Sequence, residues 1–180
     1  MDKVRITLMV CSLLLSGQGL QICYGNQQRN EVKTLSADEI QGLLNGEGMG
    51  MARAAELNHY PGPRHVLDFA SQIQLSEAQR RKTQEIYDRM HAEAVRLGGA
   101  ILHKEIEIDD TFKKNDVDSS RIKTLVTEIA RFRGELRLVH LSAHLEMKRV
   151  LSPGQIEKYD ELQGYRTRKP IDKYHHHEGH

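Results

Sequence analysis

Residues 75–112, LSEAQRRKTQEIYDRMHAEAVRLGGAILHKEIEIDDTF, decide the fold that the sequence predicts. Apolar residues recur in this stretch at helical intervals, mostly of three or four positions, which places them on one face of an α-helix. They are Ile86, Met90, Ala94, Leu97, Ile101, Ile108 and Phe112. No proline occurs in 64–152, as a long helical segment requires. We therefore expect a helix that is longer than is usual in a globular protein.

A second long helix follows a turn predicted at 115–116, and residues 118–120 offer side chains that can cap it. Ser152 caps a last short helix with Pro153 at its first position, and that helix runs to about Leu162. The apolar stripe of the second long helix has the same period: Ile122, Leu125, Ile129, Phe132, Leu136, Val139, Ala143 and Val150. The predicted fold class is all-α, an elongated antiparallel helical hairpin with short flanking helices.

The apolar stripe of such a hairpin needs more cover than one chain supplies. Two helices with one apolar face each bury little surface on their own. We therefore expect a homodimer, in which a second copy or the short helices cover the rest.

The composition limits the size and the partners of the protein. The chain has 180 residues, which suffices for one modest domain with appendages. Aromatic residues make up 5% and there is no tryptophan, which suits thin packed helices better than a barrel. With 26 basic and 25 acidic residues the net charge is +1, so we expect no nucleic-acid partner.

The first 25 residues have the pattern of an export signal. Lys3 and Arg5 precede the apolar run ITLMVCSLLL, which is too short to span a bilayer. Cleavage after Gly25 is predicted, with cleavage after Gly19, lipidation at Cys23 and a buried N-terminal helix as alternatives. After cleavage the chain has no cysteine, so packing, metal or oligomerisation must hold it together. We expect a periplasmic protein that does not insert into the membrane.

Four segments follow from this reading of the chain. Residues 1–25 are the predicted signal peptide, and residues 26–34 are a polar stretch that we expect to be disordered. The helical domain is predicted over 35–165. Residues 166–180 form a charged, histidine-rich segment that we expect to be a disordered tail.

Two copies of one short pattern flank the predicted hairpin. Residues 75–79 (LSEAQ) and 151–155 (LSPGQ) both fit L-[ST]-x-x-Q, and each stands at the start of a helix. In an exported, all-helical chain this arrangement resembles the LTxxQ-motif periplasmic proteins, which include Spy/CpxP-like chaperones and heavy-metal sensors of the CnrX and ZraP type. The resemblance covers about 35–165. Both copies have serine where the strict pattern has threonine.

The resemblance implies a fold and two functions. The fold would be a curved, cradle-like helical homodimer in the periplasm. The function would be either metal binding that reports to a membrane-bound stress sensor or ATP-independent binding of unfolded client proteins, without enzymatic activity. No nucleophile–base pair, phosphate-binding loop or paired carboxylates in the sequence indicate catalysis either.

His140 and His144 are the strongest candidates for metal ligands. Their spacing of four residues puts both imidazoles on one side of a helix, at the edge of the apolar stripe. Met147 follows on the same side. Antiparallel pairing about the predicted turn places His91 across from the pair. These side chains suit a divalent ion, most naturally zinc, with nickel, cobalt or copper as alternatives. The other interpretation is that the pair packs and hydrogen bonds locally.

The C-terminal sequence HHHEGH offers a second, looser site. Imidazoles so close together bind divalent ions even without a fold. The alternative, an added purification tag, would normally carry six consecutive histidines rather than three. The four predicted ligands are His175, His176, His177 and His180.

Overall fold

The computed structural model describes residues 32–115 and 117–165 of the chain. The regular structure of these residues is entirely helical, which confirms the predicted fold class. The predicted segments at 1–25 and 166–180, and most of 26–34, lie outside the described residues. The helices are α2 (Ala37–Leu44), α3 (Arg53–Glu56), α4 (Pro63–Asp68), α5 (Glu77–Lys113), α6 (Ser119–Val150) and α7 (Pro153–Leu162).

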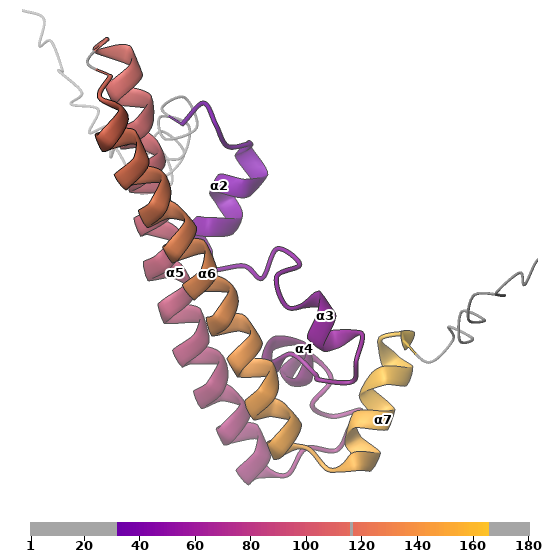
Figure 1. Ribbon diagram of the computed structural model, residues 1–180. Coiled ribbons are helices and arrows are strands. Elements are labelled where there is room, and N and C mark those ends of the chain that lie inside the picture. Colours follow the sequence, from indigo (N-terminus) through magenta and orange to yellow (C-terminus); the bar gives the residue numbers. More distant parts are fainter. Residues whose placement is uncertain (1–31, 116, 166–180) are drawn as a thin grey trace, which may run out of the picture.

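The long helices α5 and α6 form the predicted antiparallel hairpin (Figure 1). Helix α5 has 37 residues and, at about 1.5 Å per residue, extends over about 55 Å. The chain reverses at Asn115, whose φ of 54° is left-handed, a conformation that asparagine tolerates better than most residues. Asp118 then caps α6, because its carboxylate accepts hydrogen bonds at 3.2 Å from the N–H groups of Ser120 and Arg121.

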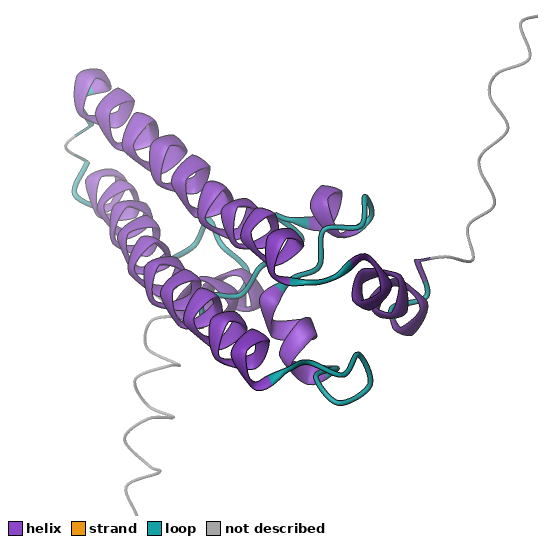
Figure 2. Ribbon diagram, turned by 90° about the horizontal axis from the view of Figure 1, so that it is seen from below, coloured by secondary structure: helices purple, strands orange, loops and turns teal. Residues whose placement is uncertain are grey.

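The short helices lie on one side of the hairpin, and two apolar clusters join them to it (Figures 1 and 2). The upper cluster holds α2 against the half of the hairpin nearer its turn. It consists of Val32, Ile40, Leu43, Ala94, Leu97, Ile101, Leu102 and Leu136. The lower cluster joins α4 and α7 to the other half. It consists of Val66, Ile73, Ile86, Met90, Ala143, Met147, Leu151, Ile156 and Tyr159.

Helix α2 docks on α5 through a glycine. A β-carbon at Gly98 would collide with the backbone carbonyl of Leu43, at the C-terminal end of α2. The neighbouring Gly99 has nothing within 4 Å of the same position. Gly98 therefore lets two backbones approach closely, and Leu43 can reach the upper cluster, where it is 2% exposed.

Each of the two LSxxQ segments begins a helix through a capping box. The Ser76 hydroxyl accepts from the N–H of Gln79 at 3.2 Å, and the Gln79 side chain accepts from the N–H of Ser76 at 3.0 Å. Ser152 and Gln155 make the same pair of bonds at 3.3 and 2.9 Å. Because the two reciprocal bonds satisfy free donors at a helix N-terminus, the pattern fixes where α5 and α7 begin.

One residue of the predicted apolar stripes is exposed. Phe112 is 56% exposed, so the prediction that it continues the buried face of α5 is wrong. The short helices pack farther down the hairpin and leave its tip uncovered by any described element (Figure 1). None of the helices in residues 32–115 and 117–165 has the length and the apolar run needed to cross a bilayer.

Candidate functional site

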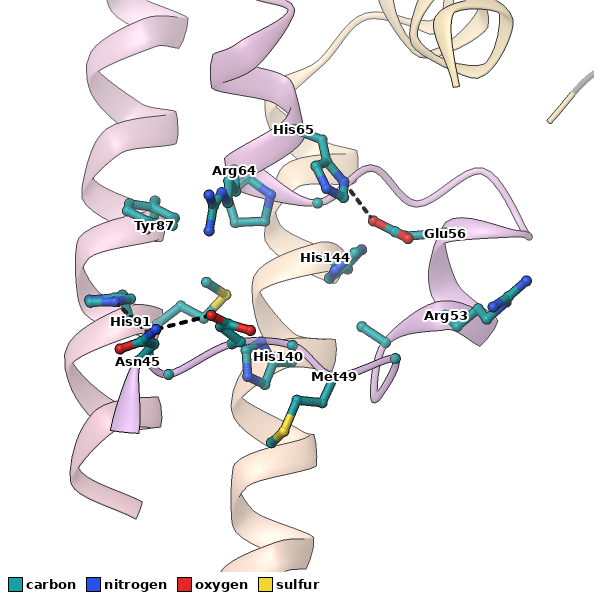
Figure 3. Close-up of a pocket in the computed structure, with 18 of the residues that line it drawn as sticks. Asn45, Met49, Arg53, Glu56, Arg64, His65, Tyr87, His91, His140 and His144 are labelled. Carbon is teal, nitrogen blue, oxygen red and sulfur yellow. Dashed lines mark hydrogen bonds and ion pairs between the residues drawn. The ribbon is translucent and has the colours of Figure 1, made fainter. Parts of the chain in front are cut away.

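A cavity of about 490 Å³ lies beside the hairpin, between the regions that the two apolar clusters occupy. The glycine-rich segment after α2 crosses it, α3 and the start of α4 close one side, and α5 and α6 form its back (Figure 3). Four histidines line this cavity, and they come from three helices: His65, His91, His140 and His144. The fold thus gathers histidines that are up to 79 residues apart in sequence.

His140 and His144 project from α6 toward this cavity and are buried, with 3% and 6% exposure. The Nδ1 atom of His144 lies 2.8 Å from the carbonyl oxygen of Tyr60. A carbonyl only accepts hydrogen bonds, so Nδ1 carries the proton and Nε2 of the neutral ring keeps a lone pair. His140 Nε2 is one of the few buried side-chain atoms of the described residues that have no hydrogen-bond partner.

Both imidazoles are held in the form that binds metal. Burial is the main cause that lowers the pKa of His140 and of His144 below the ordinary 6.5, and His144 lowers the pKa of His140 further. The hydrogen bond to Tyr60 acts in the opposite direction on His144, with a smaller effect. Since only a neutral imidazole can ligate, both side chains are ready at neutral pH.

An ion pair between α3 and α4 closes the same cavity. His65 Nδ1 lies 3.0 Å from Glu56 Oε1, with the two side chains 46% and 18% exposed. This hydrogen bond is the main cause that lowers the pKa of the Glu56 carboxyl, and likewise the main cause that raises the pKa of the His65 imidazole. Tyr165 also donates to Glu56, with its hydroxyl 3.3 Å from Oε2. The cavity therefore holds a carboxylate and an imidazole with a raised pKa beside two imidazoles with lowered pKa values.

His91 and Met147, the other two predicted ligands of the hairpin, occupy different surroundings. His91 lines the cavity from α5, as the predicted antiparallel pairing required, but on the side away from His144 (Figure 3). Its Nε2 lies 3.0 Å from the carbonyl oxygen of Asn45, and its ring stacks on Tyr87 at 5.5 Å. Met147 is 0% exposed and belongs to the lower cluster, outside the cavity lining. The four predicted tail ligands lie outside the described residues.

The predicted ligands do not form a ready-made site. Within residues 32–115 and 117–165, no three histidine, aspartate, glutamate or cysteine side chains stand close enough together to hold one ion. Sequence reasoning brought His140 and His144 together and missed Glu56 and His65. Nothing in the sequence spacing of either residue marks it as a neighbour of α6.

The fold defines a class of all-helical proteins in which a long hairpin carries its short helices on one side. The family model described as heavy-metal resistance matches residues 43–158, well over half of the chain, and this protein belongs to that family. The match spans α3 to most of α7 and so includes the whole cavity. It confirms the resemblance to heavy-metal resistance proteins that the sequence indicated. No curated protein and no solved structure gives a significant match.

Proposed function

We propose that this member of the heavy-metal resistance family is a periplasmic metal-binding accessory or sensor protein that binds a divalent ion through His140 and His144. One observation carries the proposal: two buried, neutral imidazoles, one turn apart on α6, line a cavity. His144 keeps its Nε2 lone pair, and His140 Nε2 has no partner. A buried nitrogen without a partner is costly, and a bound ion would satisfy it.

The donors in the cavity favour a borderline divalent ion. Imidazole nitrogens suit zinc, nickel, cobalt and copper, whereas calcium and magnesium prefer oxygen ligands. Zinc is the first choice, because it accepts two imidazoles with a carboxylate or water in a tetrahedral arrangement. The Tyr60 carbonyl already holds the His144 ring as the outer partner of a metal-binding histidine usually does. His91, on the opposite side of the cavity, stays a predicted additional ligand, and Met147 a more distant one.

The location and the cellular role rest on the sequence and on the family. The export signal predicted at 1–25 would deliver the protein to the periplasm, where metal ions first reach the cell. A membrane-bound stress sensor is the partner that fits a reporting role, and the proposed role includes no catalysis. The histidines predicted in the tail, His175 to His177 and His180, would add a loose second site.

Calorimetric titration with Zn²⁺ on four proteins tests the proposal. The proteins are the wild type, a truncation after Pro170, His140→Ala with His144→Ala, and His103→Ala as a matched control. The His103 side chain is 73% exposed on α5 and lies 3.2 Å from Glu107, outside the cavity lining. We expect the truncation to lose a weak phase and the double variant to lose the tight phase, with helix content preserved. The control should bind as the wild type does. If the truncation abolishes all binding, the histidine pair is structural.

A second candidate, a holdase chaperone, is favoured by apolar side chains on the outer face of α6. Leu138 and Leu145 are 62% and 51% exposed, and Leu138 borders a cavity of about 300 Å³ between α5 and α6. Such a surface can bind exposed apolar segments of unfolded proteins. If this is the function, Leu138→Ser with Leu145→Ser abolishes suppression of aggregation of a reduced client protein. Zinc would then have no effect on that suppression.

A further inference from the structure

Glu56 stands between the histidine pair and the C-terminal end of the helical domain. It is the last residue of α3, and its two carboxylate oxygens have different partners. Oε1 lies 3.0 Å from His65 Nδ1, and Oε2 accepts a hydrogen bond from the Tyr165 hydroxyl at 3.3 Å. Tyr165 lies three residues beyond the end of α7, so the Glu56 side chain links the wall of the cavity to the end of the described helical domain.

The space between Glu56 and His144 is open because residue 62 is a glycine. The position that a β-carbon of Gly62 would take lies 3.2 Å from Glu56 Oε1, 3.2 Å from His144 Nε2 and 2.9 Å from His144 Cε1. The two ligand atoms are therefore no more than about 6.4 Å apart. Two ligands of one zinc ion stand roughly 3 to 4 Å apart, given zinc–ligand bonds of about 2 Å. A small movement of the Glu56 side chain would complete the approach.

Glu56 is better placed for this role than the other acidic side chains of the cavity. Among Glu47, Glu56 and Asp68, which all line it, Glu56 is the one with a resolved electrostatic interaction with His144. Glu47 instead accepts a hydrogen bond from the Asn45 side chain at 3.1 Å. The charge of Asp68 acts on His65 instead, where it helps to raise the pKa of the imidazole.

We infer that Glu56 is an exchangeable third ligand: a divalent ion held by His140 and His144 takes the Glu56 carboxylate away from both His65 and Tyr165 and so loosens the end of α7. This inference rests on the proposed function. Zinc binding in the cavity then changes the structure around Tyr165, which is far from Glu56 in the sequence. Without the ion, Glu56 ties α3 to His65 of α4 and to Tyr165 beyond α7; with the ion, it ties α3 to α6.

Zinc titrations and hydrogen exchange on the full chain test this inference. All proteins carry alanine in place of the four tail histidines, so that only the cavity binds tightly. In this background we expect Zn²⁺ to speed amide exchange several-fold over 159–165. The N–H groups of Gln163 and Gly164, bonded at 2.9 and 3.1 Å to the carbonyls of Tyr159 and Glu161, should respond most.

Three variants separate ligation from coupling. Glu56→Gln keeps an acceptor for Tyr165 but is a poor ligand, so zinc affinity should fall about tenfold or more and the zinc effect on exchange should vanish. Gly62→Ala suits the backbone, whose φ is −84°, but fills the space between the ligand atoms and should also weaken binding. Tyr165→Phe removes the competing hydrogen bond and should tighten binding about two- to tenfold. Glu47→Gln is the matched control and should change nothing.

Each contrary result has its own meaning. If Glu56→Gln binds zinc as its background does, Glu56 is not a ligand and the inference fails, while the proposed function stands. If Tyr165→Phe leaves affinity unchanged and exchange over 159–165 does not respond to zinc, the coupling is overturned. If the background protein itself binds no zinc, the proposed function fails and the inference falls with it.

Discussion

The side-chain amides of Gln79 and Gln155 hydrogen bond to each other in both directions. Gln79 Nε2 donates to Gln155 Oε1 at 2.8 Å, and Gln155 Nε2 donates to Gln79 Oε1 at 3.0 Å. Each amide also donates to the backbone, Gln79 to the carbonyl of Val150 at 3.0 Å and Gln155 to that of Ile73 at 3.3 Å. The two LSxxQ segments therefore lock the start of α5 to the start of α7. This explains why the pattern ends in glutamine. A capping box needs only a side-chain acceptor at this position, whereas the hydrogen bonds between the two segments need side-chain donors as well.

Changing Gln79 to glutamate should therefore destabilise the protein although it preserves the capping box. The variant loses both donors of the amide and places a charge beside the oxygen of Gln155, so we expect a loss of about 1–3 kcal/mol in the free energy of unfolding. Urea unfolding followed by circular dichroism measures it. Glu39→Gln is the control, since Glu39 has the same place in the capping box of Ser36 and is exposed. An equal effect in both variants would show that the lock contributes nothing.

Adjacent glycines on α5 should respond in opposite directions to alanine. Gly98→Ala pushes a methyl group into the Leu43 carbonyl and forces α2 away from α5. It should lower the free energy of unfolding by about 1–3 kcal/mol. Gly99→Ala meets no atom within 4 Å and should stabilise by up to about 1 kcal/mol through helix propensity. Thermal unfolding of the two variants decides the matter. Equal shifts of the melting temperature would contradict the close approach of α2.

The stability should fall as the pH drops below about 6.5. Burial lowers the pKa of His140 and His144, so the unfolded chain takes up protons that the folded chain excludes. His65 has the opposite sign. Its pKa is raised, so its contribution is fully present below about 6.5 and is lost as the pH rises through the raised value.

Urea unfolding between pH 5 and 8 separates the two effects. His140→Leu should make the acid-side fall in unfolding free energy shallower, and His65→Gln should remove a loss of unfolding free energy that accompanies the rise in pH above about 6.5. Measurements without metal and with a chelator keep zinc binding out of the comparison. A slope that His140→Leu leaves unchanged would contradict a neutral, buried His140.

The homodimer predicted from the sequence can be tested on the outer face of α6. Leu138 and Leu145 lie on one side of this helix, and Leu138 borders the cavity between α5 and α6. Leu138→Glu with Leu145→Glu should convert a dimer to a monomer at micromolar concentration, seen by light scattering. Val126→Glu is the control, because Val126 is 52% exposed but about a third of a turn away around α6. A monomeric wild type would reject the prediction.

The sequence by itself determined the helices and half of the site. The period of the apolar residues placed α5 and α6, because burying one face of a helix leaves a 3.6-residue repeat. Serine and glutamine three residues apart marked the starts of α5 and α7. The four-residue spacing of His140 and His144 placed both on one side of α6, since that relation is local to a helix. Phe112, which was wrongly expected in the core, does lie in α5 as predicted, but no described element packs over it.

Only the tertiary structure decided what meets these elements. Glu56 reaches the cavity from a four-residue helix that is too short to show a period, and its contact with Tyr165 joins residues 109 positions apart. The pairing of Gln79 with Gln155 spans 76 positions. Such contacts depend on how short helices dock, and docking depends on shape: the missing β-carbon of Gly98 admits α2, and that of Gly62 leaves room beside His144. A periodic pattern records which face of a helix is buried, but not which residues of other elements bury it.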